Sequence, residues 1–237
     1  MTGRTGLVVA LQAEAALLAR RPATGQLQVL AEDSCLYLGG MGPVAARRAA
    51  LALLDAGATR LAVFGVAGAL VPALTNGTLL CPARICGGKA PPHATDDQWR
   101  RQLLERLARG GLPAHGGDLL GSATALTSTA SKQAAARHYS AVAVDMESLA
   151  VAEVAASHGV PFIVLRAVAD ECADSLPAAL VQAVDAFGRP RPLQLAAALL
   201  RHPALLGQLP RLATRMNGAL KALRAAHRVA GNSLAAI

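Results

Sequence analysis

Four acidic residues of this chain lie in two pairs, and each pair directly follows an apolar stretch of strand length. The pairs are Asp145 with Glu147, and Asp170 with Asp174. Carboxylates in such places can transfer protons or stabilise positive charge in a reaction. They can equally serve the fold alone, because an acid in the first turn of a helix or after a strand often caps that helix.

The elements around these acids are predicted to bring both pairs to one edge of a sheet. Residues 148–158 carry apolar side chains at helical spacing and are followed by Gly159, which predicts a helix that ends there. Residues 160–168 are almost wholly apolar, which predicts a strand covered on both faces. This helix joins that strand to the β-branched run at 142–144. Open α/β sheets bind ligands just beyond the carboxyl ends of such strands.

Two glycine-rich segments accompany other predicted strands. A strand at 36–38 leads into Gly39-Gly40-Met41-Gly42 and then a helix at 44–54, and a strand at 60–70 contains Gly65-Val66-Ala67-Gly68. Glycine lets the backbone approach an anion closely, and a helix N-terminus supplies unpaired N–H groups. Many strand-to-helix turns share this pattern, so the glycines alone do not assign a function.

The acids and glycines together resemble the superfamily of nucleoside phosphorylases and methylthioadenosine/adenosylhomocysteine nucleosidases. The resemblance is carried by Val144-Asp145-Met146-Glu147, which matches the family's ribose-holding stretch, and by the segment from Arg166 to Asp174, which matches its purine-holding stretch. Two motifs in the expected order are far more specific than either alone.

The resemblance implies a role for each matching residue. Asp170 would be the general acid toward adenine N7, and Glu147 would bind the ribose 2′ and 3′ hydroxyls. Glu14, after the first predicted strand, would act on the nucleophile or the ribose. Further contacts are implied with the ribose from Asp145 and Met146, with the base from Ala67, Gly68 and Val168, and with phosphate or the attacking water from Gly40, Met41 and Gly42.

The chain departs from the phosphorylases of the superfamily at two positions. Val63 and Val66 stand where the phosphorylases of small substrates place an Arg and a Ser as phosphate ligands. Inorganic phosphate as a co-substrate would therefore need other charge partners, for which Arg47, Arg48 and Lys89 are the candidates. Hydrolysis and phosphorolysis both remain open, and we expect no other cofactor.

The predicted base site also differs from that of the nucleosidases. No Phe, Tyr or Trp occurs between Trp99 and Tyr139, so the aromatic platform that stacks on adenine in those enzymes is not supplied by this stretch. A Gly/Pro-rich segment at 87–97, with His93 and Asp96, has the length of a functional loop and is a candidate lid.

Composition predicts a cytoplasmic α/β protein. Hydrophobic residues make up 53% of the chain and aromatic residues only 3%, so Ala, Leu and Val must fill the core. Four scattered cysteines indicate free thiols in a reducing compartment and no metal site. The N-terminal apolar run is interrupted early by Gln12 and Glu14, which favours a first strand over a signal peptide.

We predict a three-layer α/β/α fold with a central mixed, mostly parallel twisted sheet and a C-terminal helical tail. The expected division is a catalytic domain at 1–185 and an extension at 186–237. The extension contains eight basic and no acidic residues, which equals the whole net charge of +8.

The extension has two interpretations. Its helices at 193–200 and 203–209 are apolar, and the helix at 211–229 has basic residues opposite an apolar face. Such helices suit an anionic membrane surface, contacted through 193–229, or docking on the protein's own domain. We expect no nucleic acid partner, because no aromatic side chain follows Phe187 to stack on bases.

The order of the motifs, with Asp185-Ala186-Phe187-Gly188 and the leucine- and arginine-rich tail, is similar to the hopanoid-associated branch of the superfamily. That resemblance implies release of adenine from adenosylhopane, a lipid-linked nucleoside, by an enzyme peripheral to the inner face of the inner membrane. The alternatives are a soluble methylthioadenosine/adenosylhomocysteine nucleosidase and a non-catalytic nucleoside- or membrane-binding protein. Superfamily members are commonly oligomers, so we expect a homo-oligomer and favour a dimer.

Overall fold

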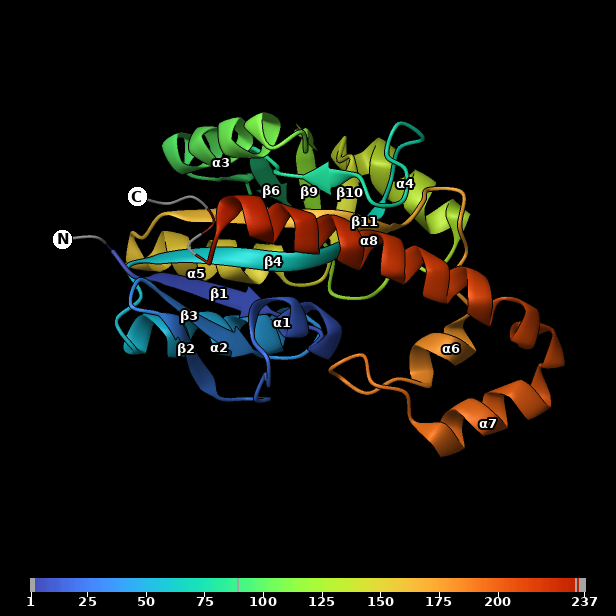
Figure 1. The fold of residues 1–237 in the computed structure, drawn as a ribbon. Coiled ribbons are helices and arrows are strands. Elements are labelled where there is room, and N and C mark those ends of the chain that lie inside the picture. Colours follow the sequence, from blue (N-terminus) through green and yellow to red (C-terminus); the bar gives the residue numbers. More distant parts are fainter. Residues whose placement is uncertain (1–2, 89, 233, 235–237) are drawn as a thin grey trace.

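The computed structural model is a twisted sheet with helices on both faces (Figure 1). It describes residues 3–88, 90–232 and 234. The strands are β1 (Thr5–Val9), β2 (Leu27–Ala31), β3 (Ser34–Leu38), β4 (Arg60–Ala69), β5 (Leu79–Leu80), β6 (Arg84–Cys86), β7 (His93–Ala94), β8 (Ala114–His115), β9 (Asp118–Gly121), β10 (Ala143–Asp145) and β11 (Phe162–Asp170). The helices are α1 (Gln12–Leu18), α2 (Pro43–Asp55), α3 (Asp97–Arg109), α4 (Thr129–Tyr139), α5 (Ser148–His158), α6 (Ala178–Gln182), α7 (Pro192–Arg201), the 3-10 helix η1 (Pro203–Gly207) and α8 (Leu209–Ala230).

The long strand β4 lies at the centre of the sheet. Its first half pairs in parallel with β1, and its last two residues pair with the antiparallel β10 on that same edge. The parallel strand β11 follows its opposite edge. Beyond these neighbours the path runs through β3 to β2 on one side and through β9 and β6 to β7 on the other. The sheet is therefore mixed and mostly parallel, which confirms the predicted fold class.

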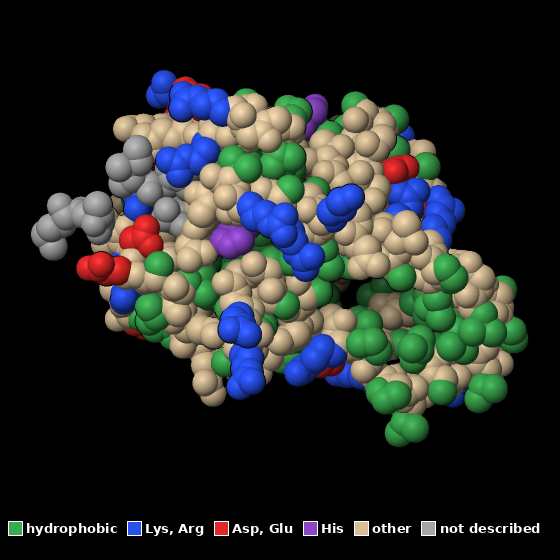
Figure 2. Space-filling view, viewed as in Figure 1, with side chains coloured by type: hydrophobic (Ala, Val, Ile, Leu, Met, Phe, Trp, Pro, Cys, Tyr) green, Lys and Arg blue, Asp and Glu red, His purple; other side chains and the backbone are tan. Residues whose placement is uncertain are grey.

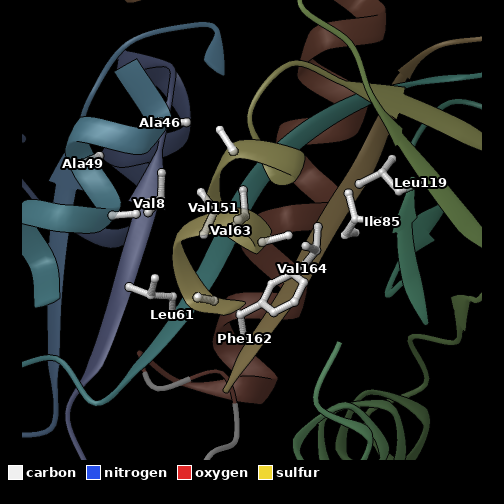
Figure 3. Close-up of a cluster of buried hydrophobic side chains, with 14 of the residues drawn as sticks. Val8, Ala46, Ala49, Leu61, Val63, Ile85, Leu119, Val151, Phe162 and Val164 are labelled. Atoms are coloured by element: carbon white, nitrogen blue, oxygen red, sulfur yellow. The ribbon is translucent and has the colours of Figure 1, made fainter. Parts of the chain in front are cut away.

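The pleat of β4 and β11 separates two hydrophobic layers. One face packs against the alanine-rich α2 and α5, with Val63, Val164 and Val151 among the buried side chains (Figure 3). The other face packs against α1, α3 and α8, through residues such as Phe64 and Leu165. Small alanine side chains on the helices let them lie close to the sheet, as the composition predicted.

The structure corrects one expectation about the strands that carry the acids. β10 and β11 are not neighbours, because β4 lies between them, and β10 runs antiparallel to β4. The two carboxyl ends nevertheless approach the same stretch of β4, one from each edge. β10 and β11 thus run in opposite directions, and their carboxyl ends bring the two acid pairs to the same part of β4.

The segment after residue 185 is helical, as predicted, and its helices differ in their surroundings. The apolar face of α8 is buried against the sheet, with Ala219, Leu223 and Ala226 fully enclosed. For α8 the docked alternative is therefore the one observed. The helices α7 and η1, together with α6, which precedes this segment, project beyond the sheet (Figure 1). Within the part of the chain that is described, no helix is both long and apolar enough to cross a membrane.

The described residues of the segment at 87–97 do not form the predicted lid. His93 and Ala94 form β7, which pairs with β6 at the edge of the sheet. Asp96 caps α3 by accepting a hydrogen bond from Trp99 N at 2.8 Å. All four cysteines are free thiols, as predicted, and three of them are buried.

Candidate active site

The floor of the candidate site is the β4 segment Gly65-Val66-Ala67-Gly68. On one edge, β11 aligns Arg166 with Gly65 and Asp170 with Gly68. On the other edge, β10 aligns Val144 with Gly68 and then carries the chain on to Asp145 and Glu147. Both sequence motifs therefore lie along this one glycine-containing strand.

A buried arginine organises the first end of the floor. Arg166 is 1% exposed, and its Nε donates to Asp145 Oδ2 at 2.8 Å while its Nη2 donates to Glu147 Oε2 at 2.9 Å. Burial alone would disfavour the cation, but these carboxylates outweigh it and raise the pKa of Arg166. A charge inside a buried strand needs such partners, so Arg166 fixes the position of both acids.

Glu147 connects this pair to the glycine turn before α2. Its Oε1 accepts a hydrogen bond from Gly42 N at 2.9 Å. Burial raises the pKa of Glu147, and the charge of Arg166 partly opposes that rise. Met146 lies beside the same turn, because its Cε is 3.9 Å from where a Cβ on Gly42 would stand. Met41 N donates to Ala186 O at 2.7 Å, so the Met41 and Gly42 amides already have protein partners.

Glu14 reaches the same end of the floor from the first turn of α1. Its carboxylate accepts hydrogen bonds from Leu11 N at 2.9 Å and Val66 N at 2.7 Å. Burial raises the pKa of Glu14 to about 7, against the lowering effect of Arg166. A Cβ on Gly65 would stand 2.5 Å from both Glu14 Oε1 and Arg166 Nη1. Glycine is therefore required where these two side chains cross the strand.

Asp170 occupies the other end of the floor. A β-bulge between Val168 and Asp170 shifts the register of β11, and the Asp170 carboxylate comes to lie over Gly68. Its Oδ2 is ion-paired with Lys132 Nζ from α4. Burial raises the pKa of Asp170, and the ammonium of Lys132 opposes that rise.

Lys132 is a second buried cation that holds the loop after β11. Its side chain is fully buried, and Nζ also donates to Glu171 O at 2.8 Å and Asp174 O at 3.1 Å. Three acceptors match the three N–H bonds of an ammonium group. Lys132 therefore fixes both the carboxylate of Asp170 and the backbone that follows it.

The bulge and its loop are also tied to α8. Asn76 Nδ2 donates to Val168 O at 3.0 Å, Ala169 O at 3.1 Å and Arg215 O at 2.7 Å. Asp174 accepts from Arg211 Nη2 at 2.7 Å and is ion-paired with Arg215 Nη1 at 3.0 Å. Asp174 of the predicted acid pair thus anchors the loop to the C-terminal helix.

The charges at the first end of the floor do not balance. Among the described residues, three buried carboxyl groups, those of Glu14, Asp145 and Glu147, surround one buried cation, Arg166. Such a cluster attracts a positively charged group and repels an anion. The cluster would therefore attract a ribosyl ring that becomes positive in a transition state.

Most of the predicted site residues lie along the β4 floor, and some of them make contacts that hold the fold rather than face the site. The side chains of Ala67 and Val168 are buried in the core, so only their backbone faces away from it. Among the candidate phosphate partners, Arg47 is ion-paired with Glu153 and Arg48 Nη2 donates to Gly39 O at 3.3 Å. Lys89 lies outside the described residues.

The site residues predicted from the sequence do not include Arg166 and Lys132, which hold the acids in place. Arg166 is the only charged residue in the apolar run at 160–168, and a lone charge in a strand buried on both faces was a usable signal. Lys132 gave no such signal, because it stands among the polar and small residues of an ordinary amphipathic helix.

Comparisons with known proteins concern the family and the fold. The model of the phosphorylase superfamily matches residues 5–201. A search of curated protein sequences found no match. Among solved structures, futalosine hydrolase of Helicobacter pylori has a TM-score of 0.69 at 17% identity, with 96% of this chain and 98% of that chain covered.

Two nucleosidase structures are also similar. A mutant of the Helicobacter pylori methylthioadenosine nucleosidase with 5′-methylthioadenosine in its active site has a TM-score of 0.69 at 16% identity, covering 96% of this chain and 99% of that chain. The S-adenosylhomocysteine nucleosidase of Streptococcus pyogenes has a TM-score of 0.64 at 20% identity, covering 73% and 85%. At these identities the likeness concerns the fold, whereas the family match covers most of the sequence. The chain belongs to the phosphorylase superfamily, the class of enzymes that cleave nucleoside glycosidic bonds.

Proposed function

We propose that this protein releases adenine from a 5′-substituted adenosine by hydrolysis of the N-glycosidic bond. The observation that carries the proposal is the placement of acids at both ends of the β4 floor. Glu147, Asp145 and Glu14 surround its first end, and Asp170 lies over its last residue. Because of the bulge, Arg166 and Asp170 align with Gly65 and Gly68, which are three residues apart on β4, about 10 Å at the usual rise. The two ends would therefore contact different parts of a nucleoside.

Each end supplies one half of the reaction. As the bond from C1′ to N9 breaks, Asp170 donates a proton to adenine N7 and adenine leaves as a neutral base. The carboxylates of Glu147 and Asp145 stabilise the positive ribosyl ring. Water forms the new bond to C1′, and Glu14 accepts its proton. Glu14 suits this role because its pKa of about 7 leaves a useful fraction of the base form at neutral pH.

Water is the proposed nucleophile for electrostatic reasons. A phosphate ion would enter a cluster that already holds three carboxylates and one arginine, and the Met41 and Gly42 amides are bonded within the protein. Val63 is buried and Val66 is apolar where phosphorylases use polar ligands. These features disfavour a phosphate dianion at the glycine turn.

For the 5′ substituent we propose a long hydrocarbon, as in adenosylhopane. The support is the resemblance of the motif order and of the leucine- and arginine-rich tail to the hopanoid-associated branch. Phe187 of that tail lies next to the glycine turn, with its Cε1 3.4 Å from where a Cβ on Gly40 would stand. The second candidate substrate is methylthioadenosine, the ligand named for one of the similar nucleosidase structures.

Product analysis of the purified protein tests the reaction. Adenosylhopane and methylthioadenosine are each incubated with and without inorganic phosphate, and adenine and the sugar product are quantified. We expect adenine and a free ribosyl product, unaffected by phosphate, with adenosylhopane preferred. A ribosyl 1-phosphate would overturn hydrolysis, and preference for methylthioadenosine would support the second candidate.

A matched pair of variants tests the role of the acid. Asp170→Asn keeps the shape of the side chain but cannot supply the proton, so we expect a fall in kcat of about 100-fold or more. Asp55→Asn changes an exposed acid at the end of α2 and should leave kcat unchanged. Equal activity of the two variants would remove Asp170 from the mechanism.

A further inference from the structure

The segment at 178–207 presents an apolar surface that the rest of the described protein does not cover. This segment, called here the α7 arm, comprises α6, α7 and η1. Of the eight large apolar side chains that are exposed among the described residues, four belong to it: Val181, Leu193, Leu200 and Leu206. Figure 2 shows hydrophobic side chains gathered over this part of the molecule. A concentration of this kind marks an interaction site.

The exposed side chains form a continuous face. Leu193, Ala196 and Leu200 are exposed at helical spacing along α7, while Ala198 on its opposite side is buried. Leu193 is 86% and Leu200 is 83% exposed, so both side chains protrude rather than line a groove. Leu206 lies in η1, which packs against α7, and its side chain is 57% exposed.

Basic residues border this face. Arg191 precedes α7 and Arg201 ends it, and both are exposed. The chain contains no Asp or Glu from residue 186 onwards. Protruding leucines between cations fit the boundary between the headgroups and acyl chains of an anionic lipid layer.

A second copy of the chain is a less suitable occupant. A twofold symmetric contact through this face would bring Arg191 and Arg201 of one copy toward the same residues of the other, without any acid on the arm after Asp185 to pair with them. An anionic membrane supplies the opposite charge. The arm is also too short to cross a bilayer, so it would lie on the surface.

The arm is attached directly to the candidate site. Ala186 O accepts from Met41 N at 2.7 Å, and Phe187 O accepts from Gln12 N at 2.9 Å. These bonds join the part of the arm between α6 and α7 to the glycine turn and to α1. A surface bound through α7 would therefore lie next to the site rather than at a remote end of the sheet.

We propose that the α7 arm docks the protein on an anionic lipid surface through Leu193, Leu200 and Leu206, with Arg191 and Arg201 at the headgroups. This narrows the membrane contact expected from the sequence, because α8 uses its apolar face inside the protein. The proposal stands on the surface alone and does not depend on the proposed reaction.

Vesicle flotation of the full chain tests it. Vesicles of phosphatidylglycerol with phosphatidylethanolamine are compared with vesicles of phosphatidylcholine alone, at low and high salt. We expect binding to the anionic vesicles that weakens with salt. The double variant Leu193→Glu, Leu200→Glu should bind at least about tenfold more weakly, because it replaces inserted apolar groups by repelled anions. Val29→Glu changes an exposed apolar residue on β2 and is the matched control, expected to bind like the wild type.

Two further measurements decide the other outcomes. Light scattering after size exclusion gives the mass of each variant, and a lower mass for the double variant would show that a second copy covers the arm, against the proposal. Wild-type protein that does not bind anionic vesicles would also overturn it. Turnover of soluble methylthioadenosine reports on the reaction separately, so failure of vesicle binding with normal turnover would refute the docking surface alone.

Discussion

Glu14 is a buried carboxylic acid whose proton is held more tightly in the folded protein than in the unfolded chain. Its pKa rises from 4.5 to about 7 because burial outweighs the attraction of Arg166. As the proposed base it must be ionised, so kcat/KM should rise with pH through about 7 and fall again at higher pH, where Asp170 loses the proton that it must donate. Glu14→Gln should lose about 100-fold or more in rate and lose this acidic limb. A pH profile that keeps the limb in the variant would assign it to another group.

The same pKa difference affects stability. A raised carboxyl pKa favours the folded state at low pH, and this contribution is lost as pH rises from about 4.5 to about 7. The total is up to about 3 kcal/mol. Urea unfolding at about pH 5 and about pH 8 should show a smaller difference for Glu14→Gln than for the wild type. Glu105→Gln, at an exposed position on α3, is the matched control and should retain the wild-type difference.

Lys132 tunes the acid at the other end of the floor. Its ammonium opposes the rise in the pKa of Asp170 that burial causes. In Lys132→Met the pKa of Asp170 should rise further, so Asp170 would stay protonated to higher pH. The fall of kcat on the alkaline side would then occur at a higher pH than in the wild type. Removing one partner of a buried ion pair should also cost about 3–5 kcal/mol of stability.

Lys221→Met provides the comparison for Lys132. It removes an exposed lysine of α8 and should change neither the pH profile nor the unfolding midpoint. A role of Lys132 in the fold alone would lower stability without moving the alkaline limb. The pH profile therefore distinguishes positioning of the acid from simple support of the loop.

At the scale of elements, β4 is the part on which the site depends most. Its glycines leave room for side chains that reach across the strand from α1 and β11. A Cβ on Gly65 would meet Glu14 Oε1 and Arg166 Nη1 at 2.5 Å, and neither side chain is free to move because each has fixed partners.

Gly65→Ala should therefore disturb the site more than the fold. We expect a loss of adenine release of about 100-fold or more, with a loss of about 1–3 kcal/mol in stability from overpacking. Gly116→Ala, where an added Cβ meets nothing within 4 Å, should behave like the wild type. Calorimetry and the adenine assay on both variants measure the two effects. Full activity of Gly65→Ala would show that Glu14 and Arg166 need not hold their positions.

Elements with strong local patterns could be predicted from the sequence. The helix at 148–158 is α5 with the same bounds, because its apolar spacing and Gly159 define both its face and its end. The direction of β10 could not be predicted, since a run of three residues does not specify its partner strand. Pairing of β10 with β4 depends on distant residues that the local pattern does not contain.

The candidate site was predictable to a similar degree. Its acids follow strands and match family motifs, so Glu147 and Asp170 could be named as candidates, and their roles stay predictions. The burial of Lys132 arises only when the loop after β11 folds over α4, and no periodicity records that contact. Arg166 was partly predictable. Its charge is conspicuous in an apolar strand, but the sequence does not show which acids it pairs with.

For the whole molecule, the C-terminal helix joins the extension at 186–237 to the catalytic layers. α8 contributes Ala219, Leu223 and Ala226 to the same core as β1, β4 and β11. Arg211 and Arg215 of α8 pair with Asp174, in the loop that directly follows Asp170 at the end of β11. Part of the basic charge of the extension is thus paired with acids of the protein itself. The match to the family model also continues into the extension, to residue 201.

This connection predicts that α8 supports both the fold and the site. Leu223→Ala removes a fully buried side chain from the core and should cost about 2–5 kcal/mol, a fall in Tm of about 10 °C. Leu200→Ala shortens an exposed leucine of α7 and should leave Tm unchanged, because little buried contact is lost. Thermal unfolding of both variants, followed together with adenine release, makes the comparison. If Leu223→Ala melted like the wild type, the extension would be a separate unit, and its arginines could not hold the loop of Asp170 as described.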